Sequence, residues 1–520
     1  MSTNPLFQCA VTAAATELPS SLSYAQKGEI YGLYKVSTVS ATPTSARPGF
    51  FDQVGRGKWD AWTAAGANGG KSADQAQTEY IALVEQLSGK KLSLPEAPAS
   101  SSSSSSSTTE SSSSSLTPPA PPAAPAAPAA IDCTEMVVIS YADLVAASHP
   151  SASPELLSSL QSSVSAAFGY DGMGILAVSG VPSLSPLRAR LLPLAARFAA
   201  LPEEAKRKTE TPHAFYQVGW SYGNEKLQGD KPDFAKGSYY CNPLVDRPFD
   251  DEALIKKYPS FLEPNIWPTE DLPDFEPAFK ALGQAVVAVG RLLAKQCDEY
   301  VQNVLGDAYV PGRFFKLLTE SKCCKGRLLH YYPSDEVCKM MEARGVSAAC
   351  EGGDMDNDFS DWCGWHNDHG SLTGLVPAMY FDRDVNPVPN PDPQSGLYVR
   401  SRHGRLVQVK MPASAGPDAV AFQIGETSQI HTGGVLQATP HAVRGAFGDK
   451  AAGISRDTFA VFMEPEFDGD MTLPRGKTGE DVQSSEAVGH LPKTVKTLMS
   501  RWREGMDFGE FSDATFSAFY

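Results

Sequence analysis

Apolar side chains recur at helical spacing in the first 92 residues of the chain. The pattern is clearest over residues 30–34 and 80–87, where apolar positions fall three and four residues apart. A Pro-Gly pair at residues 48 and 49 interrupts the chain between these segments. The pattern predicts that residues 1–92 fold as a small helical bundle.

The stretch from residue 95 to residue 130 has no apolar pattern. It is a run of serines followed by a run of proline and alanine, without an aromatic residue that could start a core. Serine-rich chain is flexible, and chain rich in proline is stiffer, so these 36 residues would span roughly 30 to 60 Å. Residues 95–130 are therefore predicted to be a disordered linker that tethers two domains.

The pattern after the linker alternates between strands and helices. Residues 131–275 show strand patterns at 137–139 and 174–180 and helical patterns at 154–167 and 184–200, which predicts an α+β N-terminal part.

Residues 277–305 carry one apolar stripe and predict a long helix. Six short strand patterns follow it, at 328–332, 396–400, 406–411, 419–424, 436–443 and 458–463. We expect a jelly roll with two sheets over residues 276–470, and a C-terminal extension of unassigned role over 471–520.

Composition and charge exclude several classes of protein. A chain of 520 residues with 42% hydrophobic content can build more than one core, and its net charge of −16 repels nucleic acid. Residues 1–92 carry six Lys and two Arg against three Asp and four Glu, a net charge of +1. Only this part is suited to an anionic ligand.

The chain has no run of about 18 apolar residues that could form a transmembrane segment, and it does not begin like a secretory signal. Its nine cysteines lack a C-x-x-C framework. We therefore expect a cytoplasmic monomer with reduced thiols.

Two blocks of residues 1–92 combine aromatic and basic side chains: YGLYK at residues 31–35 and GRGKWDAW at residues 55–62. Tyr31 and Lys35 are four residues apart and share a helical face, where a ring can lie against a base while an ammonium meets a phosphate. For any single residue the simpler reading is a buried ring or a solvated lysine. The two blocks together favour a nucleotide-phosphate site.

Over roughly residues 5–90 the sequence resembles the acyl-CoA-binding protein family. The resemblance rests on YGLYKVSTV (31–39), ARPGFFD (46–52), GKWDAW (57–62) and AQTEYIALVEQL (76–87). It implies a four-helix bundle that binds long-chain acyl-CoA. The implied ligand-binding residues are Tyr31, Gly32, Leu33, Tyr34, Lys35, Lys58 and Tyr80, with Arg56 as a helper.

Two positions depart from the pattern of this family. Val36 stands where many members have glutamine, and Val54 stands where many have a second lysine. The loss of one cation at a phosphate site costs about 1 kcal/mol or more, so we expect weaker binding than is usual in the family.

The motif WHNDHG places His366 and Asp368 two residues apart, so on extended chain both side chains project to the same side. With His441 on a later predicted strand they would complete the two-histidine, one-carboxylate set that holds Fe(II). An H-x-D triplet alone is more often a turn histidine beside a solvated aspartate. Here Arg456 and Thr458 follow His441 and can present a guanidinium and a hydroxyl to a carboxylate, which favours the metal site.

Residues 132–465 resemble the isopenicillin N synthase-like branch of the 2-oxoglutarate- and Fe(II)-dependent dioxygenases. Beyond the H-x-D motif, the resemblance rests on LLHYYPS (328–334), GLYVRSRHGRLVQVKMP (396–412) and AVAFQIGETSQIHTGG (419–434). It implies that His366, Asp368 and His441 bind iron, and that Arg456, Thr458 and Tyr332 bind 2-oxoglutarate.

The resemblance also implies dioxygen as cosubstrate, ascorbate as a helper reductant, and hydroxylation of a small molecule or lipid coupled to oxidative decarboxylation of 2-oxoglutarate. Three residues differ from the usual pattern: His330 replaces an asparagine, Glu426 an aspartate and Thr458 a serine.

Other polar groups near these motifs are expected to have structural roles. His369 would compete with Asp368 as a ligand, so we expect it outside the metal set. Cys323 and Cys324 are expected to be packing thiols, because adjacent cysteines rarely reach disulfide geometry. The acidic stretch at residues 351–362 is expected to be an exposed loop.

The tether suggests how the two parts work together. A flexible link raises the local concentration of a delivered ligand to about the millimolar range, so the oxidised substrate is expected to be an acyl-CoA or an acyl-derived lipid. Two alternatives stay open: a carrier of acyl-CoA with a catalytically inactive jelly roll, and two active domains in which the first only localises the second.

Overall fold

The structure is a computed structural model that describes residues 4–16, 24–43, 53–66, 70–92, 132–224, 234–343, 362–492 and 495–519, with residues 18 and 47. It has two compact units, Met1–Ala123 and Ala124–Tyr520. The predicted linker at 95–130 lies outside the described residues, as does the acidic stretch before residue 362.

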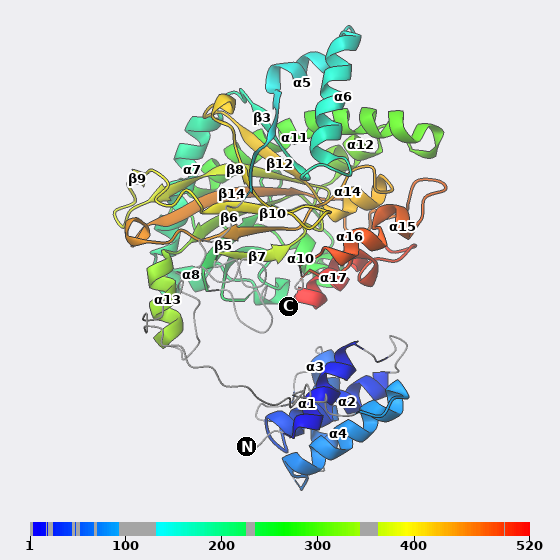
Figure 1. Cartoon of the computed structure of the whole chain (residues 1–520). Coiled ribbons are helices and arrows are strands. Elements are labelled where there is room, and N and C mark those ends of the chain that lie inside the picture. Colours follow the sequence, from blue (N-terminus) through cyan, green and yellow to red (C-terminus); the bar gives the residue numbers. More distant parts are fainter. Residues whose placement is uncertain are drawn as a thin grey trace, which may run out of the picture. The chain divides into compact units, whose positions relative to one another are not determined.

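The N-terminal unit is a bundle of helices, as predicted. Its described elements are α1 (Pro5–Thr16), α2 (Tyr24–Thr38), α3 (Gln53–Ala65) and α4 (Ala73–Ser88), drawn in blue in Figure 1. Ser72 starts α4 with a capping box that satisfies free backbone N–H groups, and Gly89 ends it in the left-handed conformation. A core that includes Phe7, Trp62 and Tyr80 holds the helices together.

The second unit contains two β-sheets. The larger sheet has the order β2 (Val137–Ser140), β3 (Ile175–Ser179), β12 (Val420–Ile424), β8 (Leu372–Phe381), β14 (Ser455–Met463), β6 (Lys325–Tyr331), β5 (Lys236–Cys241) and β4 (Gly219–Tyr222), with β9 (Pro387–Val388) paired to β8. The smaller sheet has the order β1 (Asp132–Glu135), β11 (Leu406–Lys410), β10 (Gly396–Arg400), β13 (His441–Arg444) and β7 (Cys363–His366). Strands from residues 131–275 join both sheets, so that part of the chain belongs to the same roll.

The predicted strands agree with the observed ones except at residues 436–443, where only His441–Arg444 is a strand. The backbone just before it is used elsewhere: the N–H of Gln437 donates to the carbonyl of Phe168 and that of Ala438 to Oε1 of Gln429. The segment is therefore fixed by bonds that a strand pattern does not reveal.

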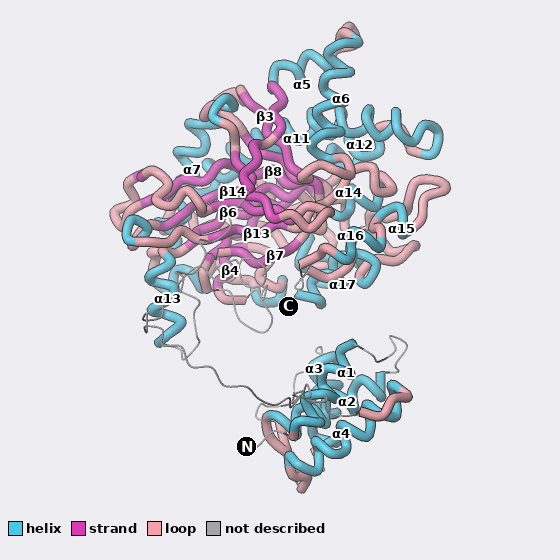
Figure 2. The backbone as a smooth tube through the Cα atoms, in the orientation of Figure 1, coloured by secondary structure: helices cyan, strands magenta, loops and turns pink. Residues whose placement is uncertain are grey.

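Helices cover the outer face of the larger sheet (Figure 2). They are α5 (Tyr141–Ala147), α6 (Pro154–Phe168), α7 (Leu184–Ala199) and α11 (Phe275–Leu305), and α12 (Arg313–Glu320) packs against α11. The predicted apolar stripe of α11 is buried in the main core against β14 and β8. Gly290 allows this packing, because a Cβ there would lie 2.3 Å from the Cε of Met463.

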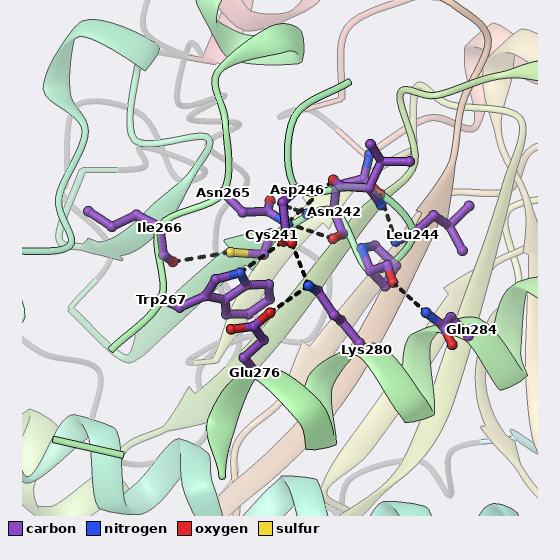
Figure 3. A network of polar contacts seen from close by, with 12 residues as sticks. Cys241, Asn242, Leu244, Asp246, Asn265, Ile266, Trp267, Glu276, Lys280 and Gln284 are labelled. Carbon is purple, nitrogen blue, oxygen red and sulfur yellow. Dashed lines mark hydrogen bonds and ion pairs between the residues drawn. The ribbon is translucent and has the colours of Figure 1, made fainter. Parts of the chain in front are cut away.

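A polar network anchors the segment between β5 and α11 (Figure 3). The carboxylate of Asp246 accepts hydrogen bonds from Nδ2 of Asn265, Nε1 of Trp267 and Nζ of Lys280. Because Lys280 lies on α11, both ends of the segment are tied to that helix. The segment carries α9 (Glu252–Lys257) and α10 (Pro259–Leu262).

The C-terminal extension packs on the roll through a second core. This core joins α10 to residues that include Val482, Leu498, Trp502 and Phe511. The extension contains α15 (Gly479–Val482), α16 (Ser485–Gly489) and α17 (Phe508–Phe519), which lie in one region of Figure 1 with α14 (Glu426–His431). It is therefore built into the second unit.

Within the described part of the chain, no helix has the length and apolar character needed to cross a membrane. Among the described residues, seven cysteines are free thiols, including the neighbours Cys323 and Cys324, as expected. Cys338, on α13 (Ser334–Ala343), is disulfide-bonded, which corrects the expectation that all the thiols are reduced.

Candidate functional site

The three predicted metal ligands meet at the edge of the smaller sheet. His366 ends β7, His441 begins β13, and the two residues are paired directly across these strands. Asp368 follows where the chain leaves β7, and the backbone N–H of Glu426 on α14 donates to its carbonyl. The loop that carries Asp368 is therefore fixed by α14.

The ligand atoms of these residues converge. Oδ1 of Asp368 lies 3.8 Å from Nε2 of His366 and 3.8 Å from Nε2 of His441. All three ligand atoms lie within 4.8 Å of one another, and this is the only such group among the described residues. Two imidazoles and one carboxylate that leave open positions are typical of non-haem Fe(II) oxygenases.

Hydrogen bonds orient both imidazole rings toward this point. Nδ1 of His366 lies 2.7 Å from the carbonyl of Gly364. Nδ1 of His441 lies 2.7 Å from the side-chain amide of Gln423 and 3.2 Å from the carbonyl of Thr439. Both Nε2 atoms therefore face Asp368 and can bind a metal.

Burial sets the protonation states that a cation needs. It lowers the pKa of His366, and it lowers that of His441 to about 4, so both rings are neutral at neutral pH. Burial alone would raise the pKa of Asp368, but the two histidines outweigh it and the pKa is lowered. The site thus offers two neutral imidazoles and a carboxylate.

A cavity of about 170 Å³ begins at these ligands and runs between the two sheets. Apolar side chains from both sheets line most of it, and Arg456 and Thr458 line it from β14. Nε and Nη1 of Arg456 are buried, and no hydrogen-bond partner for them is present among the described residues. A carboxylate fits this position, because it would give the buried guanidinium a charged hydrogen-bond acceptor.

Aromatic rings fix the guanidinium of Arg456, which lies 5.0 Å from the ring centre of Tyr331 and 5.8 Å from that of Trp362. The hydroxyl of Thr458 donates to the carbonyl of Val376 at 2.7 Å, so it must turn before it can donate to a ligand. Of the two residues, Arg456 offers the stronger contact to an acid.

The structure brings Tyr331 to this cavity, and not the predicted Tyr332. Successive side chains on a strand face opposite sides, and Tyr331 pairs across β6 and β14 with Arg456. The ring of Tyr332 instead contacts the rings of His330 and Tyr222. The alternation of Arg327, Leu329 and Tyr331, all lining the cavity, is the feature that could have identified Tyr331.

A second cavity of about 110 Å³ also reaches His366 and Asp368. Its wall includes Lys325 and Arg327 of β6, Glu464 after β14, and Thr515 and Phe516 of α17. His369 lines it too and, as expected, is outside the ligand set. The metal position is thus open to two cavities.

The predicted acyl-CoA residues form a cluster on the N-terminal bundle. Nζ of Lys35 and Nζ of Lys58 each lie 5.8 Å from the ring centre of Tyr31, and Nζ of Lys35 lies 5.5 Å from that of Trp62. Two cations close to aromatic rings are suited to a nucleotide phosphate.

The other predicted contacts of the bundle are more buried. Tyr80 packs on Phe7 and near Tyr34, and its pKa is raised to about 12, mainly by burial. Leu33 belongs to the core, and Gly32 lets α2 approach the backbone of Ala61 on α3. The side chain of Arg56 and nearly all of the motif at 46–52 lie outside the described residues.

Comparison with known proteins agrees with the N-terminal site. Residues 4–84 match the family model described as acyl-CoA binding protein. The chain is 49% identical over 73 residues to acyl-CoA-binding domain-containing protein 1 of Oryza sativa subsp. japonica, covering 14% of this chain and 76% of that protein. It is 45% identical over 76 residues to the acyl-CoA-binding protein of Ricinus communis, covering 15% of this chain and 80% of that protein. Through this part, the chain belongs to the acyl-CoA-binding protein family.

The second unit matches a different family model. Residues 138–270 match the family model described as non-haem dioxygenase in morphine synthesis N-terminal. The chain is also similar to a full-length Neurospora crassa protein solved in complex with alpha-KG, with a TM-score of 0.48 and 19% identity over 73% of this chain and 95% of that one. It is similar as well to a putative 2OG-Fe(II) oxygenase family protein from Caulobacter crescentus, with a TM-score of 0.48 and 18% identity. That match covers 75% of this chain and 98% of the other.

The family match and the three converging ligands define the second unit as an oxygenase that uses Fe(II) and 2-oxoglutarate.

Proposed function

We propose that this chain binds long-chain acyl-CoA through its N-terminal bundle and oxidises an acyl-derived substrate at an iron site formed by His366, Asp368 and His441. The observation that carries the catalytic part is the guanidinium of Arg456 in the cavity that contains all three ligands. Its Nε and Nη1 are buried and have no partner among the described residues.

The residues of the second unit have distinct roles in this proposal. A ferrous ion held by the three ligands supplies the redox chemistry with dioxygen and 2-oxoglutarate. Arg456 forms a forked ion pair with the far carboxylate of 2-oxoglutarate, which fixes the direction in which this cosubstrate lies. The apolar walls of the same cavity exclude water and strengthen that ion pair.

The residues of the N-terminal unit hold the nucleotide part of acyl-CoA. Lys35 and Lys58 supply positive charge to its phosphates, and both ammonium groups lie near the ring of Tyr31. The predicted linker at 95–130 would keep the bound ligand at about millimolar local concentration near the oxygenase. This favours a substrate that derives from acyl-CoA.

The second candidate is an acyl-CoA carrier with an inactive jelly roll. The converging ligands speak against it, because a scaffold has no need of two oriented imidazoles beside a buried carboxylate.

One assay separates the two candidates. The full chain is loaded with Fe(II) under anoxic conditions, supplied with 2-oxoglutarate and then with dioxygen, and succinate is measured. The proposal predicts slow formation of succinate even without substrate, whereas a carrier forms no more succinate than a buffer control that contains iron and ascorbate.

A further inference from the structure

The second cavity contains a cation whose charge is not balanced by direct contact. Lys325 begins β6 and its side chain is part of the cavity wall. Its ammonium donates to the carbonyl of Ser260, and no carboxylate of the described residues lies within ion-pair distance of it. An ammonium has three N–H bonds, so up to two are left for a ligand.

The position of Lys325 favours an anionic ligand. The residue is partly exposed and lies in the cavity wall, so its ammonium can be reached by a ligand in the cavity. Burial lowers the pKa of Lys325, and the charge of Glu464 opposes this change without contact.

A second cation lies on the same face of β6. Arg327 is two residues further along, lines the same cavity and is held by the hydroxyl of Ser238 and the ring of Tyr240. Asp368 and Glu464 line the same cavity, so its wall carries charged groups of both signs. Among these groups, Lys325 is the cation whose ammonium points to a backbone carbonyl rather than to a carboxylate of the described residues.

Glu464 supplies a polar group of the opposite kind. Its side chain is 5% exposed and makes no hydrogen bond with a described residue, and its Oε1 lies 3.8 Å from Nε2 of His369. Burial raises the pKa of Glu464 to about 7. Near neutral pH both forms of this carboxyl are present. The protonated form can donate a hydrogen bond to a carboxylate, and the ionised form can accept one from a hydroxyl.

We propose that the second cavity is the substrate pocket and that it binds a free carboxylate, held by the ammonium of Lys325. This rests on the proposed function, since the oxidised carbon must reach the same metal. The oxidised carbon then lies within a few bonds of the acid group, and the rest of the molecule extends past Phe261 and Phe516.

The proposal restricts the relation between the two units. In an acyl-CoA the carboxyl carbon is bound to sulfur, so the thioester has no free acid for Lys325. Hydrolysis breaks the C–S bond, consumes one water molecule and releases the fatty acid and the thiol of CoA. A reaction of this class must precede oxidation if the acid comes from acyl-CoA. The other source of the same chemistry is a short free acid unrelated to acyl-CoA.

Matched probes test the proposal on the full chain with Fe(II), 2-oxoglutarate and dioxygen. The probes are hexadecanoate, hexanoate, their methyl esters and their CoA thioesters, and the readout is succinate formed above the rate without a probe. We expect at least one free acid to raise this rate several-fold, and neither type of ester to do so. Stimulation by hexadecanoate points to an acyl-CoA source, and stimulation by hexanoate alone to a short acid.

Two outcomes overturn the proposal: stimulation by an ester as strong as that by its acid, or basal succinate formation that no acid raises. A chain that forms no succinate under any condition contradicts the proposed function itself, and this inference with it.

Variants of Lys325 give a second test. Lys325→Met removes the charge but keeps much of the apolar stem, and we expect it to raise the KM for the stimulating acid at least tenfold. Lys325→Arg keeps the charge and should retain most of the response. Lys322→Met, at an exposed position three residues earlier, is the matched control and should behave as the unchanged chain. An unchanged KM in Lys325→Met contradicts the proposal, and so does a lost response in Lys325→Arg if that variant is folded.

Discussion

Arg501, in the C-terminal extension, donates a hydrogen bond of 2.6 Å from Nη2 to Oε1 of Glu426, and the two side chains are 4% and 1% exposed. The same carboxylate oxygen accepts from Nδ2 of Asn367 at 3.0 Å. Asn367 stands between the ligands His366 and Asp368. The extension is thus joined to the metal loop through one carboxylate.

This relationship predicts a double effect of Arg501→Met. Removing one partner of a buried ion pair leaves the other charged and unpaired, so we expect a loss of about 3 to 5 kcal/mol in the free energy of unfolding. We also expect weaker binding of Mn(II) at the metal site, because Asn367 loses its fixed acceptor. Urea unfolding and calorimetry with Mn(II) measure these two effects separately.

The matched control is Arg503→Met, which removes an exposed arginine two residues further along. It should leave both quantities within about 0.5 kcal/mol of the unchanged chain. Metal binding in Arg501→Met as tight as in the control would show that the extension does not position the metal loop.

Arg456→Ala should weaken the use of 2-oxoglutarate far more than it weakens folding. A charge-assisted hydrogen bond contributes about 1.5 to 3 kcal/mol, so we expect the KM for 2-oxoglutarate to rise roughly 10- to 150-fold. Arg456→Lys keeps the charge but loses the two parallel N–H donors of the guanidinium. Its KM for 2-oxoglutarate should therefore lie between that of the unchanged chain and that of Arg456→Ala. The rate of succinate formation against 2-oxoglutarate concentration gives the KM. Arg383→Ala, at an exposed position, serves as control, and a KM equal to that control would contradict the role of Arg456.

Lys35→Met should weaken the binding of hexadecanoyl-CoA to the full chain. The ammonium lies beside the rings of Tyr31 and Trp62, where we place the phosphates, so its removal is expected to raise the Kd about tenfold or more. Isothermal calorimetry measures the Kd. Lys91→Met, just beyond α4, changes the net charge equally and should have little effect. Equal losses in the two variants would mean that net charge alone attracts the ligand.

The stability of the second unit should depend on pH through His431. This residue is buried on α14, its Nε2 lies 2.7 Å from the carbonyl of Asp470, and its pKa is lowered to about 3, first by burial and then by Arg313. An unfolded histidine has a pKa of about 6.5. Between these values the unfolded chain binds one more proton, so stability falls as the pH falls from about 6.5 toward 3.

His431→Asn should remove this contribution, and the slope of unfolding free energy against pH should decrease by up to about 1.4 kcal/mol per pH unit. Urea unfolding at pH 7, 5.5 and 4.5 measures the slope. His149→Asn, at an exposed position, should leave it unchanged. The same slope in both variants would contradict the assignment.

Two of the three converging residues, His366 and Asp368, could be predicted from their local spacing, and His441 from its place on a later predicted strand and from the resemblance to a known family. His366 and Asp368 are two residues apart on chain leaving a strand, and His441 begins another strand that pairs with the first. The choice between Tyr331 and Tyr332 depended on which face of β6 meets the cavity. A shift of one residue exchanges the faces of a strand, and only the pairing with β14 fixes the register.

The role of the C-terminal extension could not be predicted. Arg501 reaches Glu426 across 75 residues of sequence, and Thr515 and Phe516 reach the second cavity from α17. Neither contact leaves a periodic pattern, because each depends on how the extension packs around α10. The unpaired charge of Lys325 is likewise visible only when its surroundings are known in three dimensions.

The measurement that tests the central claim most directly is the stoichiometry of Fe(II) bound under anoxic conditions by the full chain and by His441→Ala, with His403→Ala, an exposed histidine, as control. The unchanged chain and the control should each bind one Fe(II) per chain and form succinate from 2-oxoglutarate, while His441→Ala loses both. Full iron occupancy in His441→Ala, or no iron in the unchanged chain, would contradict the iron site on which the proposed oxidation rests.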